Sequence, residues 1–232
     1  MVVGEKFAWA HIPKTGGDST HLLFRDLEDD SLRFIDGPEK HNSFAKEGIT
    51  GLDRISNIRR LPSLLKSWAV HYSQHSKWNP GNDDRIFTRN QLLRGMVWWL
   101  EPYTSDWKLV KFDEVVFDYY ELDKIDHWIR TEYLLDDFRT VMSEYLDISK
   151  LDSDFLSNPG SYKRKIQFSR RELREIYTSC SRWAELEAAV YGNLQRSDEH
   201  YKEYLEEYVV NPINSTRAKL GKLKRSLRKK EL

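Results

Sequence analysis

The sequence predicts an α/β protein in which a central parallel β-sheet is flanked by helices in a three-layer arrangement. Two observations predict this class. Short segments rich in apolar and β-branched residues recur along the chain, and segments with helical spacing of apolar residues lie between them. Strands that alternate with helices favour a parallel sheet covered by helices. The length of 232 residues is sufficient for one such domain with a substantial core.

Apolar runs predict five strands, at residues 6–11, 32–35, 54–58, 108–112 and 125–129. A helix is predicted after the first strand, at residues 19–27, with Leu22, Leu23 and Leu27 on one face. Two longer amphipathic patterns predict helices at residues 136–146 and 170–191, and Asn158-Pro159-Gly160 marks a loop before the second. Ligands bind at the carboxyl ends of the strands in such sheets, so the segments that follow the strands hold the candidate site.

The sequence pattern changes after residue 196. An acidic amphipathic helix is predicted from Ser197 to near Asn211-Pro212, and the last 17 residues carry eight lysines or arginines and no aromatic residue. We therefore expect one domain at residues 1–196 and a helical, basic appendage at residues 197–232. The tail has Leu220, Leu223 and Leu227 at helical spacing. It is either a basic amphipathic helix that contacts an anionic surface or partner, or a frayed terminus.

The composition limits the classes of function. The 37 lysines and arginines balance 37 aspartates and glutamates, so the overall charge predicts no nucleic-acid partner. Cys180 is the single cysteine, which excludes an intrachain disulfide and gives no support for an oxidising compartment. Runs of about 18 apolar residues are absent, so we expect no transmembrane segment and a cytoplasmic location.

The loop after the first strand carries the strongest chemical signal. Residues 11–20 read HIPKTGGDST and lead into the first helix. Backbone N–H groups and the helix dipole attract an anion there, the glycines let the backbone approach it, and Lys14 adds a charge. The loop is therefore either an oxyanion site or an ordinary β-to-α turn with a Thr or Asp cap. The familiar phosphate loop G-x-x-x-x-G-K-[ST] is absent, because Lys14 precedes the glycines.

A second candidate anion site follows the strand at residues 54–58. Arg59 ends this strand, Pro62 suits the first turn of a helix, and Ser67 lies about one and a half turns into that helix. An arginine and a facing serine would form a pocket for a second anion. The alternative is that Arg59 and Arg60 are solvated surface charges and that Ser67 is an exposed helix residue.

Taken together, these segments resemble the sulfotransferases that use 3′-phosphoadenosine 5′-phosphosulfate (PAPS), and the carbohydrate branch in particular. Residues 11–17, HIPKTGG, are similar to the 5′-phosphosulfate loop of the family, and Arg59 followed by Ser67 is similar to its 3′-phosphate motif. Residues 127–138 contain the R-x-E-x-L-x-x-D-F pattern of a late strand and helix, and residues 183–192 resemble the closing helix. Two departures are Asp18, where Thr or Ser is common, and a proline displaced by one in Arg-Arg-Leu-Pro. The resemblance covers residues 6–192.

The resemblance implies a P-loop-like fold, PAPS as sulfuryl donor and 3′-phosphoadenosine 5′-phosphate (PAP) as product, with no metal. It implies in-line transfer to an acceptor hydroxyl, for which we expect a carbohydrate. Lys14 would neutralise the charge that grows on the leaving side. We expect Asp18 to point away from the anion or to cap the helix. The cofactor-binding residues that it implies are Lys14, Thr15, Gly16, Gly17, Asp18, Ser19, Thr20, Arg59, Ser67 and a basic loop of Lys163, Arg164 and Lys165.

The resemblance places a general base after the second strand. His41 is our first choice because imidazole titrates near neutral pH, and Glu39 is the alternative. Without the resemblance, His41 is a surface-loop histidine. We expect a structural role for His11, and an exposed or capping position for His71 and His75 on a helix.

The acceptor side is less determined. Four aromatic residues, Trp98, Trp99, Tyr103 and Trp107, either pack a core or stack on sugar rings. Three arginines, Arg85, Arg89 and Arg94, either line a route for an acidic acceptor or are solvated. Two other functions compete with the sulfotransferase. One is a nucleotide kinase or NTPase with a variant phosphate loop, which the missing G-K-[ST] disfavours, and the other is a non-catalytic module that binds an adenosine bisphosphate or an anionic glycan.

Overall fold

The computed structural model describes residues 1–74, 88–100, 107–151 and 166–195. The chain divides after Gln195 into two units, and the described residues all lie in the first, Met1–Gln195. The predicted loop at residues 158–160 and the predicted appendage at residues 197–232 lie outside the described residues.

The central sheet has five strands in the order β3 (Arg33–Phe34), β1 (Val2–Val3), β2 (Phe7–Ala10), β4 (Asp53–Ile58) and β7 (His127–Arg130). The neighbours β2, β4 and β7 are parallel, with Ile55 opposite both Trp9 and His127. Strand β1 is antiparallel to both β2 and β3. The sheet is therefore mixed, and the prediction of a parallel sheet is wrong at this edge. The reason is a tight turn at Gly4, whose N–H donates to the Phe7 carbonyl at 3.0 Å and reverses the chain.

The segment predicted as a strand at residues 108–112 is β6 (Trp107–Lys111), and it lies outside the central sheet. It pairs antiparallel with β5 (Met96–Leu100), with Val97 opposite Val110, in a separate two-stranded sheet. Only residues 101–106 separate the two strands, and a connection of this length joins antiparallel neighbours but not parallel ones. The sequence interpretation missed β5.

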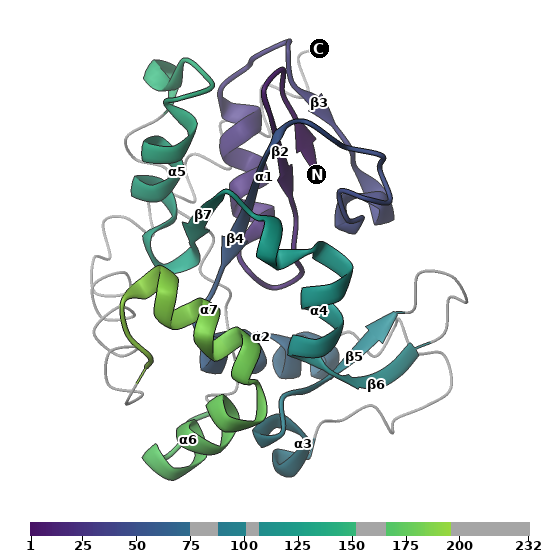
Figure 1. The fold of residues 1–232 in the computed structure, drawn as a ribbon, viewed down its shortest axis with the longest axis vertical. Coiled ribbons are helices and arrows are strands. Elements are labelled where there is room, and N and C mark those ends of the chain that lie inside the picture. Colours follow the sequence, from purple (N-terminus) through teal and green to yellow (C-terminus); the bar gives the residue numbers. More distant parts are fainter. Residues whose placement is uncertain (75–87, 101–106, 152–165, 196–232) are drawn as a thin grey trace. The chain divides into compact units, whose positions relative to one another are not determined.

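Helices cover both faces of the central sheet, which confirms the three-layer α/β class (Figure 1). Successive side chains of a strand point to opposite faces. Phe7 and Trp9 pack with α1 (Gly17–Asp26) and α5 (Leu134–Met142). Ala8 and Ala10 belong to the core on the other face. The helices on that face are α2 (Leu61–Gln74), α4 (Phe112–Tyr120), α6 (Arg170–Ser179) and α7 (Ser181–Tyr191).

Two helix predictions need correction. Leu23 in α1 and Leu27 directly after it are buried as expected, but Leu22 is 45% exposed, and Phe24 takes its place in the core. The predicted helix at residues 170–191 is broken at Cys180, which has the non-helical angles φ −119° and ψ 62°. The Cys180 thiol packs on Gly95, where an added Cβ would lie 2.0 Å from Sγ, so α6 and α7 meet at a packed corner.

The remaining helix in the described ranges is α3 (Arg89–Leu93), and three further turns are the 3₁₀ helices η1 (Gly37–His41), η4 (Leu122–Lys124) and η5 (Thr131–Tyr133). A last 3₁₀ turn, η6 (Ile148–Lys150), follows α5. Helices long and apolar enough to cross a membrane do not occur in this part of the chain.

Candidate functional site

The candidate site lies where the three parallel strands β2, β4 and β7 end. Because these strands are neighbours, their carboxyl ends lie at one edge of the sheet, and the segments that follow them come together there. The hydroxyl of Thr131, the first residue after β7, shares its one proton between the carbonyls of Thr15 and Ile58, the latter at 2.9 Å. One side chain thus joins the loops that follow β2 and β4.

The loop that begins at His11 leads into α1 through two glycines, Gly16 and Gly17, at positions where a side chain would not fit. Gly16 is the N-cap of α1 with φ +89°, and an added Cβ would lie 2.9 Å from Cγ2 of Thr131. An added Cβ on Gly17 would lie 2.0 Å from the His11 ring. Gly16 offers no side-chain acceptor to the first turn of α1. The Ser19 and Thr20 N–H groups donate to the Gly16 carbonyl, at 3.0 Å and 3.1 Å, so the preceding N–H groups of Gly17 and Asp18 form the kind of site that binds an anion.

Lys14 and Arg59 are brought together although they are far apart in sequence. The Arg59 guanidinium donates to the Lys14 carbonyl at 3.1 Å. The Lys14 ammonium lies 3.2 Å from Nδ1 of His71, and because an ammonium only donates, His71 accepts this hydrogen bond. His71 is half-buried, so its expected exposed position is wrong, but it lies in the last turn of α2, as the capping alternative expects. His75 lies outside the described residues.

Ser67 lies on the same side of α2 as the Lys14 contact. It precedes His71 by four residues, and residues four apart share one face of a helix. Ser67 is buried, with 3% of its surface exposed, so the alternative that it is an exposed helix residue is wrong. Arg59, Ser67 and the Lys14 loop therefore border one region of the molecule.

The hydroxyl groups predicted to bind the cofactor have different environments. Thr15 donates to the Ile12 carbonyl at 2.8 Å, and Thr20 donates to Oδ1 of Asn57 at 3.1 Å, with both side chains fully buried. Ser19 is half-buried in the first turn of α1. The two threonine hydroxyls hold the loop in shape, so the backbone N–H groups, Lys14 and Ser19 are the remaining candidates for contact with an anion.

Asp18 points away from the loop. Its carboxylate is 2.7 Å from the Lys40 ammonium and its side chain is 79% exposed. Burial alone would raise the pKa of Asp18, but the hydrogen bond and charge of Lys40, with the charges of Lys14 and His41, lower it overall. The negative charge is thus neutralised outside the anion site.

His41 lies at the end of η1 and packs against the loop. Its ring centroid is 4.4 Å from that of His11, and its Nδ1 is 3.0 Å from the His11 carbonyl. A carbonyl only accepts, so Nδ1 carries the proton and the lone pair of the neutral ring is on Nε2. Burial, together with the charge of Lys40, lowers the pKa of His41, although the hydrogen bond to His11 opposes this.

Glu39 has a different orientation from His41. Its side chain is exposed, and its carboxylate folds back over Gly37, where an added Cβ would lie 3.0 Å from Oε2. The carbonyl of His41 accepts a hydrogen bond from the Tyr120 hydroxyl at 2.8 Å, which anchors the end of η1. The geometry therefore brings His41 to the loop and leaves Glu39 on the surface of its own turn.

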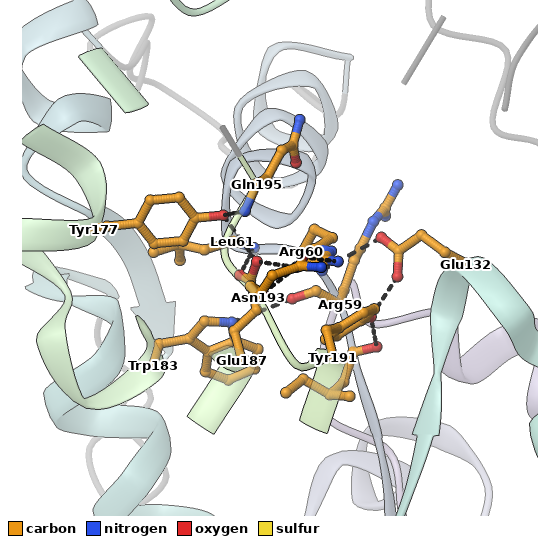
Figure 2. Close-up of polar contacts among 11 residues, drawn as sticks. Arg59, Arg60, Leu61, Glu132, Tyr177, Trp183, Glu187, Tyr191, Asn193 and Gln195 are labelled. Carbon is orange, nitrogen blue, oxygen red and sulfur yellow. Dashed lines mark hydrogen bonds and ion pairs between the residues drawn. The ribbon is translucent and has the colours of Figure 1, made fainter. Parts of the chain in front are cut away.

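Sequence reasoning missed the group of side chains that holds the Arg59–Arg60 turn (Figure 2). Trp183, Glu187 and Tyr191 lie four residues apart on α7 and all contact this turn. Glu132, in η5, accepts from the Arg60 N–H at 3.3 Å and from the Tyr191 hydroxyl. The sequence did contain one indication of this group: Glu187 is a carboxylate on the apolar face of a helix, between Trp183 and Tyr191.

The predicted acceptor-side residues show no common site in the described ranges. Trp99 packs edge-on against Tyr119 and Tyr120, at 5.7 Å and 6.4 Å between centroids, and is part of the core layer. Trp98 is half-buried, Arg94 is exposed, and Arg89 forms a bidentate ion pair with Glu172 at 2.5 Å and 2.8 Å. The other predicted residues lie outside the described residues: Tyr103, Arg85, Lys163, Arg164 and Lys165. Trp107 belongs to β6, but its side chain is not described.

Within the described ranges, no group of three histidine, cysteine or acidic side chains is placed to hold a metal ion. Comparison of the chain with family models, curated proteins and solved structures returns no match. The function must therefore be argued from the site itself.

Proposed function

We propose that the protein is a PAPS-dependent sulfotransferase that transfers a sulfuryl group to an acceptor hydroxyl, for which a carbohydrate is the proposed class. One observation carries the proposal. The hydrogen bond from Arg59 to the Lys14 carbonyl, at 3.1 Å, joins two candidate anion-binding segments that are 45 residues apart in sequence. A ligand with two separate anionic groups uses both segments, whereas a triphosphate needs only one.

The residues present fit such a ligand. In the proposed arrangement, Lys14 and the first-turn N–H groups of α1 hold the 5′ end, and Gly16 and Gly17 allow the loop to pack closely on Thr131 and His11. Arg59 and Ser67 hold the 3′-phosphate, since a guanidinium matches phosphate geometry. The basic residues 163–165, which lie outside the described residues, remain proposed contacts by the family resemblance alone.

The donor supplies the sulfuryl group when it is bound, and the chain's own residues carry the rest of the chemistry. His41 accepts the proton of the acceptor hydroxyl on Nε2, as that oxygen bonds to sulfur. Lys14 and the N-terminus of α1 stabilise the charge that remains on the phosphate oxygen when its bond to sulfur breaks. Asp18 does not oppose this charge, because it is paired with Lys40.

Calorimetry with PAP, with ADP and with ATP plus magnesium tests the proposed class. We expect micromolar binding of PAP and weak binding of ATP. Micromolar binding of ATP with magnesium and none of PAP would favour a kinase or NTPase with a variant phosphate loop. Binding of PAP without turnover of PAPS over a broad panel of hydroxyl acceptors would favour the non-catalytic module.

Lys14→Ala and Arg59→Ala test the two anion sites separately. Each variant removes a charged partner of one anionic group, so we expect PAP binding to weaken about 10- to 100-fold in each case. Lys6→Ala and Arg33→Ala are matched controls, because both side chains are exposed and lie away from the carboxyl edge of the sheet, Lys6 directly before β2 and Arg33 at the start of β3. Unchanged PAP affinity in both site variants would contradict the proposed site.

A further inference from the structure

The turn between β4 and α2 is held by side chains from elsewhere in the fold. The Tyr191 hydroxyl shares its one proton between Glu132 and the Ile58 carbonyl, the latter at 3.2 Å, and the Arg59 carbonyl accepts from Nε1 of Trp183 at 3.2 Å. The Arg60 and Leu61 N–H groups donate to Glu132 and Glu187, at 3.3 Å and 2.7 Å (Figure 2). The backbone that carries Arg59 is therefore fixed over four consecutive residues.

Glu187 is the most buried charged residue of this group, with 0% of its surface exposed. Its carboxylate accepts hydrogen bonds from the Leu61 N–H, from Nη1 of Arg60 at 3.0 Å and from the Tyr177 hydroxyl at 2.8 Å. Leu61 is the first residue of α2, so the carboxylate also lies at the positive end of the helix dipole. An internal carboxylate thus occupies the helix end that would otherwise attract a ligand anion.

Glu187 also decides the orientation of Arg60. The Arg60 guanidinium bonds to Glu187 and to the Asn193 carbonyl and side chain, at 2.6 Å and 2.9 Å, and lies 4.0 Å above the Tyr191 ring. Arg60 is therefore committed to α7 and the residues that follow it. Of the two adjacent arginines, Arg59 is the one directed to the Lys14 loop.

We propose that Glu187 is a positioning residue for recognition of the second anionic group of the ligand, the 3′-phosphate. By holding Arg60 on α7 and by closing the first turn of α2, it fixes the turn so that Arg59 faces the Lys14 loop. This inference rests on the proposed function, and it assigns a role to a residue outside the proposed ligand contacts. Its consequence is specific: loss of the Glu187 charge reduces selectivity for the 3′-phosphate rather than nucleotide binding in general.

The test compares the affinities for PAP and for adenosine 5′-phosphate, which lacks the 3′-phosphate. Glu187→Gln keeps the shape of the side chain and removes its charge. We expect this variant to bind PAP at least about 10-fold more weakly, because the loss corresponds to one charge-assisted hydrogen bond. We expect its affinity for adenosine 5′-phosphate to stay within about twofold of that of the unmodified protein. Equal weakening of both nucleotides, or no change in PAP affinity, would overturn the proposal.

Two further variants separate positioning from stability. Glu172→Gln removes a carboxylate that bonds Arg89 and caps α6 but does not contact the turn, so it should lower stability and leave the ratio of the two affinities unchanged. Trp183→Phe removes the donor to the Arg59 carbonyl and keeps an aromatic ring of smaller volume in the core, and it should lower the same ratio if Glu187→Gln does not fold. A Trp183→Phe protein that folds and keeps the ratio would then contradict the proposal.

Amide hydrogen exchange at Leu61 distinguishes failure of this inference from failure of the proposed function. Glu187→Gln should speed exchange at Leu61 whether or not a nucleotide binds, because the amide loses its charged acceptor. If the unmodified protein binds neither nucleotide, the proposed function fails, and so does the role of Glu187 in recognition of the 3′-phosphate. Faster exchange at Leu61 in Glu187→Gln would still support the role of Glu187 in fixing the turn. Unchanged exchange would overturn the positioning itself.

Discussion

Lys14 has a backbone conformation that favours glycine. Its φ is +67°, in the left-handed region, where a side chain costs about 1 kcal/mol relative to glycine. The neighbouring Gly16 and Gly17 show that glycine is tolerated in this loop. A lysine at such a position therefore indicates that its ammonium has a role, in agreement with its place at the candidate anion site.

Lys14→Gly should separate stability from binding. We expect the free energy of unfolding, measured with urea, to rise by about 0.5–1 kcal/mol, because glycine relieves the left-handed strain. We expect PAP binding, measured by calorimetry, to weaken about 10-fold or more, because the charge is lost. Glu28→Gly is the matched control, since Glu28 has φ +48° at the end of α1 and should gain stability without loss of binding. A Lys14→Gly variant that binds PAP normally would remove Lys14 from the site.

His41 should behave as a neutral base with its proton on Nδ1. Burial lowers the pKa of its imidazole, so an NMR titration should place it below the usual value of about 6.5, with a signal assigned through His41→Gln. Nitrogen shifts should show the Nδ1–H tautomer that the His11 carbonyl requires. In transfer assays, His41→Gln should lose at least about 100-fold in rate, while Glu39→Gln should not. The reverse order would make Glu39 the base.

The residues of the candidate site differ in how far the sequence reveals them. Lys14, Gly16 and Gly17 share one loop, so their chemistry can be recognised from a short motif. Glu187 and His71 reach the site from distant helices, through contacts to Leu61 and Lys14. Such contacts depend on how helices pack on the sheet, and local spacing does not report them.

At the scale of elements, strand positions were predictable and strand partners were not. Apolar runs located β2, β3, β4, β6 and β7, because each of these strands overlaps a run of apolar and β-branched residues in the sequence. The two-residue strand β1 is too short for such a pattern, and β5 was interpreted through its tryptophans. Strand pairing depends on the length of the connecting turn and on which strand lies next to it in the fold. The antiparallel pairing of β1 and the separate β5–β6 hairpin could therefore be recognised only in the structure.

The corner between α6 and α7 depends on one glycine in the hairpin. Gly95 has φ +66°, its carbonyl accepts from the Phe112 N–H at 2.9 Å, and an added Cβ would lie 2.0 Å from Sγ of Cys180. Burial raises the pKa of the Cys180 thiol to about 12, so the thiol is neutral and packs as a small apolar group. The helix break and the hairpin therefore share one packing contact.

Gly95→Ala should destabilise the protein strongly, and a second substitution should partly restore it. We expect the free energy of unfolding to fall by about 2–4 kcal/mol, from left-handed strain and from the clash with Sγ. In a Cys180→Ala background the clash disappears, and the cost of Gly95→Ala should fall to about 1 kcal/mol. Urea unfolding of the four proteins of this cycle measures the coupling. Additive effects would show that the two residues do not share a contact.

At the scale of the whole molecule, folding places three histidines where protonation is unfavourable. Burial lowers the pKa of His11 well below its usual range, assisted by the charges of His41 and Lys40. Burial also lowers the pKa of His41, and that of His21, for which Asp36 opposes the effect. The stability of the fold is therefore linked to pH through the region beside the candidate site.

The sign of this linkage follows from proton counts. Below about pH 6.5 the histidines of the unfolded chain bind protons, while these folded histidines do not until the pH falls further. The unfolded state then binds more protons, so the free energy of unfolding decreases as the pH falls through this window, by at most about 1.4 kcal/mol per pH unit for each group. Burial raises the pKa values of Glu187 and Asp113, which contribute a slope of the opposite sign at the acid end.

His11→Gln isolates the histidine contribution from these acidic groups. Urea unfolding of both proteins at pH 7.5, 6.5 and 5.5 should show a smaller loss of stability on acidification in the variant, whatever its stability at pH 7.5. The expected difference in slope between pH 6.5 and 5.5 is about 1 kcal/mol per pH unit, because His11 is 2% exposed and its Nδ1 has no hydrogen-bond partner among the described residues. The carboxyl groups are common to both proteins and cancel in this comparison. If the free energy of unfolding changes equally with pH in both proteins, His11 is protonated in the folded protein as readily as in the unfolded chain. That result would contradict the burial of His11 under the loop.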